Sequence, residues 1–251
     1  MTVEQGITLA MALAFCAVHL FIARLRVLDV QPRSRWLSFA GGTAVAYVFL
    51  HIMPDLAAHG SAFSEATGLG PLLADSLVFT LALAGLALFY GAERATALIG
   101  AERDRARANG HSPPAVFWVH IAATSLLVLV VGYLLNHREE EGLAALALSF
   151  AALLLHFVTA DFAAHAHHPR LYEERARFVL AGATLAGWAA GLAFEVSELA
   201  VGGLFAFVGG AIVLIALKEE LPAERESRLV PFLAGAGLYA ALVLGERSLV
   251  G

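Results

Sequence analysis

The sequence predicts an all-α, polytopic membrane protein, with eight transmembrane helices in a single domain over residues 1–251. Apolar residues make up 59% of the 251 positions and charged residues 15%, with a mean hydropathy of +0.75, whereas a soluble domain has about 45–50% apolar and about 25% charged residues. The apolar residues fall in runs close to the ~20 residues that cross a hydrocarbon layer. Basic residues are scattered in short clusters between these runs, which argues against a nucleic-acid-binding face. We therefore expect the lipid bilayer as a partner, and we expect the chain not to be an enzyme.

Eight apolar windows of about 19 residues define the expected helices. Proline and glycine residues lie in or beside most of the connections, where they interrupt helices. No lysine or arginine precedes the first window, so the basic start of a cleaved signal peptide is missing and we expect the first helix to be retained. The expected spans are residues 6–25, 36–56, 71–92, 115–136, 143–166, 177–195, 199–217 and 229–246.

The distribution of basic residues gives the expected orientation. The connections after the first, third, fifth and seventh spans hold 14 of the 16 lysine and arginine residues. Because basic loops stay in the cytoplasm, this alternation requires every span to cross the membrane and places both termini outside the cytoplasm. We expect the chain in a plasma membrane, the inner membrane of a bacterium.

Glycine and alanine are abundant in spans six to eight, for example at Gly187, Gly210 and Gly235. Small residues let membrane helices approach closely, because packing drives helix association in lipid. We interpret these glycines as packing residues and assign them no ligand.

Ionisable side chains within the spans are the candidates for function, because each costs at least about 2.5 kcal/mol at the bilayer centre. With a rise of about 1.5 Å per residue, His19 in span one and His156 in span five lie at the same depth, and His120 in span four reaches a similar level. Asp161 lies about one and a half turns further inward on span five. Three histidines at one level predict a layer that binds a metal ion or protons, although each alone is also typical of a hydrogen bond between helices.

A second group lies nearer the outer end of span two. His51 and Asp55 are four residues apart and so share one face of a helix. Pro54 between them can free a backbone carbonyl and bend the helix. A carboxylate can capture a cation, and a neighbouring imidazole suits borderline metals such as zinc or iron(II). We expect this pair to bind a metal ion or to relay protons.

Two motifs resemble the ZIP family of divalent metal transporters. The second span ends with YVFLHIMPDL at residues 47–56, and the seventh ends with IALKEELP at residues 215–222. The corresponding family helices carry a His-x-x-Pro-acid element and an acid-acid-Leu-Pro ending. The resemblance implies a ZIP-like helix bundle and a divalent metal substrate, zinc or iron(II). It is also compatible with a homodimer.

The resemblance also implies metal sites between the fourth and fifth helices. His120 and His156 match the leading histidines of the two family motifs, and Asp161 can stand for the last acid of the longer one. The asparagine, the proline and the bridging acids of the family are missing. This departure favours a single metal ion over a two-metal centre, since two imidazoles carry no negative charge to offset paired dications.

Three functions remain open. The first is a ZIP-like protein that binds or transports a divalent metal, with His120, His156, Asp161, His51, Asp55 and His19 as candidate ligands. The second is a carrier or sensor that moves no metal and takes up protons on its intramembrane histidines. The third is an intramembrane zinc hydrolase, in which three histidines hold zinc and a nearby carboxylate acts as the base.

Overall fold

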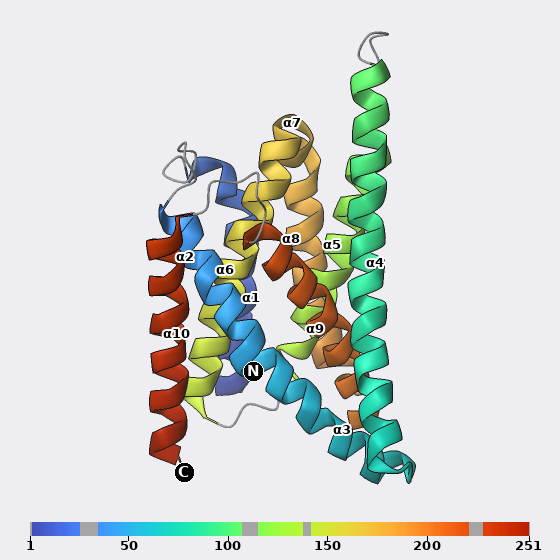
Figure 1. The fold of residues 1–251 in the computed structure, drawn as a ribbon, viewed down its shortest axis with the longest axis vertical. Helices are drawn as coiled ribbons and strands as arrows, with labels where there is room; N and C mark the ends of the chain where they lie inside the picture. Colours follow the sequence, from blue (N-terminus) through green and yellow to red (C-terminus); the bar gives the residue numbers. More distant parts are fainter. Residues whose placement is uncertain (1, 26–34, 107–114, 138–141, 221–227, 251) are drawn as a thin grey trace.

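The computed structural model describes residues 2–25, 35–106, 115–137, 142–220 and 228–250, and these ranges contain helices and turns but no strand (Figure 1). Within them, eight helical segments are long and apolar enough to cross a membrane. The prediction of an all-α protein with eight apolar spans is therefore confirmed, and the chain is an integral membrane protein. The elements are α1 (Val3–Phe21), η1 (Ile22–Arg24), α2 (Arg35–Tyr47), η3 (Val48–Ile52), α3 (Met53–Thr67), α4 (Pro71–Ala106), α5 (Ala115–Leu134), α6 (Leu143–His167), α7 (Pro169–Leu171), η5 (Tyr172–Ala176), α8 (Arg177–Ala193), α9 (Glu198–Glu220) and α10 (Leu229–Val250).

Successive spans run in opposite directions along the long axis of the bundle (Figure 1). α10 ends at the lower end of the view, where α3 also ends and α4 begins, and α1 starts toward the same end. The continuous helix formed by α2, η3 and α3 crosses the bundle obliquely, from beside α10 to beside α4. An even number of passes thus brings the start of α1 and the end of α10 toward the same end of the bundle. The side of the membrane that this end faces remains a prediction.

Three helices extend at least two turns beyond the predicted spans. The second continues through Pro54 to Thr67, the third continues to Ala106, and the sixth begins at Pro169. Hydropathy windows register only the apolar part of a helix, whereas the alanine, glutamate and arginine of residues 93–106 favour helix without being apolar. Proline is tolerated in the first helical turn, where its missing N–H has no helical partner to lose.

Glycines join three pairs of parallel helices through the same reciprocal contact. In the α4–α9 pair, a Cβ on Gly85 would overlap the Phe207 carbonyl, and a Cβ on Gly210 would overlap the Ala82 carbonyl. In this pair, the glycine of one helix packs against a backbone carbonyl of the other helix. That carbonyl belongs to the residue three positions before the other helix's glycine. Close approach of this kind gains packing and Cα–H···O contacts in lipid. The same contact joins α2 to α10 through Gly42 and Gly235, and α5 to α8 through Gly132 and Gly187.

The packing role predicted for the glycines is thus confirmed at Gly187, Gly210 and Gly235. At Gly182 and Gly237, by contrast, an added Cβ would meet no atom within 4 Å. Glycine content alone does not separate the glycines that pack against a neighbouring helix from those that do not. The rotation of each helix about its axis decides which glycine faces a neighbour.

α6 packs against α1, α2, α9 and α10. Ser149, His156 and Asp161 are buried along its length. This single helix therefore presents polar groups to several neighbours at different depths, and it is the element around which the candidate site is built.

Candidate functional site

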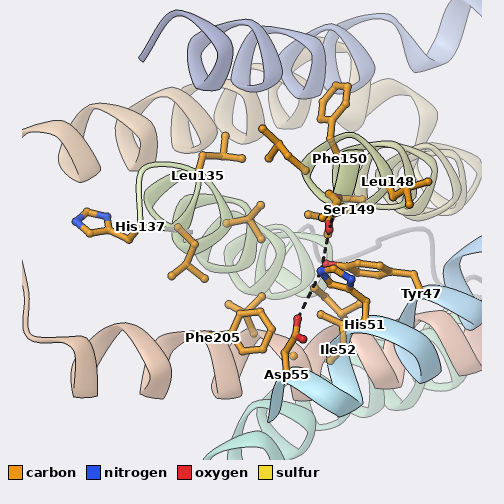
Figure 2. Close-up of a pocket in the computed structure, with 18 of the residues that line it drawn as sticks. Tyr47, His51, Ile52, Asp55, Leu135, His137, Leu148, Ser149, Phe150 and Phe205 are labelled. Atoms are coloured by element: carbon orange, nitrogen blue, oxygen red, sulfur yellow. Dashed lines mark hydrogen bonds and ion pairs between the residues drawn. The ribbon is translucent and has the colours of Figure 1, made fainter. Parts of the chain in front are cut away.

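A cavity of about 320 Å³ lies between α3, α5, α6, α9 and α10 (Figure 2). Most of its wall is apolar, which is usual for a ligand pocket, and a few polar groups converge on it. We call it the His51 cavity. Its ionisable lining residues are His51, Asp55, His59, His137, Glu246 and Arg247.

The His51 cavity is shaped by an irregular turn in the second span. Residues Val48–Ile52 form the π-helical turn η3, immediately before Pro54. Proline has no N–H, so the Leu50 carbonyl four residues earlier lacks its usual helical donor. Arg247 of α10 donates to this carbonyl instead, at 2.9 Å from Nη2. The freed carbonyl is therefore satisfied by another helix, and π-helical turns of this kind are frequent at functional sites.

His51 forms the centre of the polar group in this cavity. Its Nε2 lies 2.8 Å from the Ser149 hydroxyl of α6 and 3.5 Å from Oδ2 of Asp55 (Figure 2). The ring stacks on Tyr47, with centroids 5.2 Å apart. The His51 side chain is 11% exposed and that of Asp55 is 36% exposed. The imidazole is thus held from three sides, while the carboxylate reaches the open part of the cavity.

Two further histidines line the same cavity. His59 of α3 is buried, and its ring lies 5.0 Å from that of Phe205 on α9. His137 stacks on Tyr133 at 4.4 Å and lies apart from the His51–Asp55 pair in Figure 2. His59 therefore belongs to the face that carries His51 and Asp55, whereas His137 does not join them.

The inner group is arranged around Asp161. Oδ2 of Asp161 lies 2.6 Å from Nδ1 of His19, and both side chains are almost fully buried. The hydroxyl of Tyr172 donates to the His19 backbone carbonyl at 3.1 Å. Nε2 of His19 has no hydrogen-bond partner among the described residues. A carboxylate on one ring nitrogen of a histidine is the usual way in which the other nitrogen is oriented for a ligand or a proton.

A second, smaller cavity of about 90 Å³ borders Asp161, and we call it the Asp161 cavity. His120, Asp161, His168 and Lys218 line it. His156 does not, although it lies on the same helix and is fully buried. Both ring nitrogens of His156 lack a hydrogen-bond partner within the described part of the chain, so the interhelical hydrogen bond considered for it is not seen there.

The structure therefore divides the six predicted residues into separate places. His51 pairs with Asp55, His19 pairs with Asp161, and His120 shares a cavity with Asp161. In the ranges that the structure describes, no three His, Cys, Asp or Glu side chains are close enough together to hold one metal ion. The metal-binding role of these residues remains a prediction.

Three residues of the His51 cavity were not singled out from the sequence. His59 follows Asp55 by four residues, so its position on the same helix face was available from the spacing. Ser149 and Arg247 carry no such signal, because each contacts the second span from a helix far away in sequence.

No known family model matches the chain, and no curated protein is significantly similar to it. The assignment of function therefore rests on the residues and their geometry.

Proposed function

We propose that this protein is a ZIP-like plasma-membrane carrier that binds a divalent cation, zinc or iron(II), in the His51 cavity and moves it across the bilayer. The observation that carries the proposal is the approach of an imidazole and a carboxylate on the wall of one cavity. Nε2 of His51 and Oδ2 of Asp55 lie 3.5 Å apart there, on a helix that is long and apolar enough to cross a membrane.

The donor set fits a borderline divalent metal. Imidazole nitrogen and carboxylate oxygen are both common zinc ligands, whereas magnesium prefers an octahedron of oxygens. Asp55 supplies the negative charge that a dication needs in a low-dielectric region. A cavity of about 320 Å³ has room for several water molecules, so the cation can keep part of its hydration while two protein ligands hold it.

The position of the second cavity supports a carrier more than a simple binding protein. α5, α6 and α9 each contribute residues to both cavities. On α6 the two linings are separated by the single turn from Leu153 to Phe157, and on α9 by the turn from Ile212 to Ile215. A layer about one turn thick, roughly 6 Å, thus lies between the two cavities, and on α6 it contains the buried His156. A small shift of these helices would connect them.

Metal binding to the purified protein tests the proposal. Isothermal titration with zinc in detergent should give binding that His51→Ala and Asp55→Ala each weaken by about 10-fold or more, as loss of a site residue typically does. His137→Ala is the matched control, because His137 lines the same cavity but stacks on Tyr133. Absence of binding in the unmodified protein, or equal losses in all three variants, would contradict the proposed site.

In reconstituted vesicles the same variants should weaken uptake most at low metal concentration. A pair that captures the cation determines how well a dilute cation is bound, whereas saturation hides a loss of affinity. An equal loss at every concentration would instead assign the pair to conduction or folding.

A proton carrier is the second candidate, and the His19–Asp161 contact favours it. Buried aspartate and histidine pairs within a membrane commonly mark proton relays. Vesicles with an entrapped pH indicator and an imposed membrane potential distinguish the two functions. A proton carrier acidifies the interior without metal, and Asp161→Asn stops it, whereas a metal carrier gives no signal until zinc is added.

A further inference from the structure

Three side chains of types that commonly bind metals follow one another along the face of the second span that lines the His51 cavity. His51, Asp55 and His59 are spaced by four residues each, and all three line the cavity. Each step of four residues rises by about 6 Å, so His51 and His59 are separated by about 12 Å along the helix with Asp55 midway. The three side chains therefore form a row along the cavity wall.

His59 is held at one end of this row by α9. Its ring packs on Phe205, and a Cβ placed on Gly202 would lie 3.0 Å from its Nδ1. This separation is tighter than ordinary van der Waals contact, so the imidazole depends on Gly202 having no side chain. The neighbouring Gly203 leaves more room, because its nearest contact would be 3.6 Å away.

One cation cannot contact both ends of the row. Zinc–nitrogen bonds are about 2.0–2.1 Å long, far shorter than the rise between His51 and His59. The lack of any three-residue ligand cluster among the described residues agrees with this geometry. Asp55, however, is one turn from each histidine.

We propose that His59 is a further cation ligand, and that the cavity holds two overlapping positions for the divalent cation, His51–Asp55 and Asp55–His59, which share the Asp55 carboxylate. This inference rests on the proposed function and adds the path of the cation through the site. Because one carboxylate serves both positions, the second dication is repelled and the cavity holds one cation at a time. With the predicted orientation, Asp55–His59 is the outer position, and transfer to the His51–Asp55 position moves the cation about one turn inward.

The experiment compares zinc binding in single and double variants of the purified chain. His59→Ala alone should raise the dissociation constant by less than about twofold, since the His51–Asp55 position, whose loss in His51→Ala costs about 10-fold or more, is the tighter one and keeps most of the cation. In the His51→Ala background the same change should remove binding as completely as Asp55→Ala does. The stoichiometry should stay at one zinc per chain in every variant that binds.

Gly202→Ala provides a subtler variant, with Gly203→Ala as its matched control. The added Cβ displaces the His59 ring without removing it, so Gly202→Ala should repeat the effect of His59→Ala in the His51→Ala background, and Gly203→Ala should not. Thermal unfolding of each variant in the same detergent checks that it is folded.

The outcomes separate the two levels of the proposal. Suppose that zinc binds and Asp55→Ala abolishes binding, but His59→Ala changes nothing in the His51→Ala background. His59 is then not a cation ligand, and the proposed His51–Asp55 site is retained. Two zinc ions per chain would also overturn the shared position. If the unmodified chain binds no zinc, the proposed function fails and this inference fails with it.

Discussion

Truncation of Asp161 should strongly destabilise the protein, because it leaves a buried histidine without its partner. The Asp161 carboxylate lies 2.6 Å from Nδ1 of His19, with side chains only 2% and 0% exposed. Loss of one member of a buried pair costs about 3–5 kcal/mol. For a chain of this length each kcal/mol lowers the melting temperature by about 2–4 °C, so Asp161→Ala should lower it on the order of 10 °C. Asp161→Asn keeps the size and one hydrogen-bonding oxygen and should lose less than half as much.

Thermal unfolding in one detergent, followed by tryptophan fluorescence, measures these shifts. The double variant His19→Ala/Asp161→Ala should lose less than the two single losses added together, because the second change removes the group that the first left unpaired. His156→Leu is the matched control, since His156 is equally buried but makes no hydrogen bond within the described residues. An apolar replacement removes unsatisfied nitrogens and should keep or raise the melting temperature. Additive single losses, or a similar fall for His156→Leu, would refute the argument.

Four other predictions follow from the packing and from the proposed site. Gly210→Ala should lower the free energy of unfolding by about 1–3 kcal/mol, because the added Cβ forces α9 away from a carbonyl of α4. Gly182→Ala meets open space and should raise the free energy of unfolding by up to about 1 kcal/mol through helix propensity. Chemical unfolding measures both changes. Arg247→Ala removes the donor to the Leu50 carbonyl, so it should loosen η3 and weaken zinc binding in titration calorimetry. Zinc binding should also weaken as the pH falls, because a protonated imidazole no longer ligates a metal. A reporter that is active only outside the cytoplasm should give signal when fused after Gly251, and a signal from a cytoplasm-only reporter would reverse the orientation.

The sequence predicted the helices well because lipid leaves the chain few choices. Each apolar run of about 20 residues must satisfy its backbone internally, and a helix is the way in which a single segment can do so. The ends were less accurate, since helix continues past the apolar window wherever residues such as those of 93–106 favour it. Pro54 was expected to bend the second span, and the structure shows how the helix continues past it, through η3 and the bond from Arg247 to Leu50.

Within the candidate site, local pairs were predictable and contacts between distant segments were not. His51 and Asp55 lie on one helix face, so their spacing was enough. Counting residues also gives the depth of His19, His156 and Asp161, but depth does not fix the rotation of a helix about its axis. His19 faces Asp161, whereas His156, at the same predicted depth as His19, faces no hydrogen-bonding group in the described part of the chain. Ser149 contacts His51 across 98 residues of sequence, a separation at which no local pattern carries information.

α6 links the two polar groups, and its packing differs from that of the helices around it. Six helices are joined in pairs by glycine contacts that bring backbones together, whereas α6 contains no glycine and meets its neighbours through side chains. Its Ser149 bonds to His51 at one cavity, and its Asp161 bonds to His19 at the other. Both bonds are made by a single rigid helix, so a displacement of α6 that breaks one of them must strain the other. We therefore expect the His51 contact and the His19–Asp161 pair to be coupled, and Ser149→Ala, which removes the bond to His51 together with the local bond to the Ala145 carbonyl, should change the accessibility of the His19–Asp161 pair.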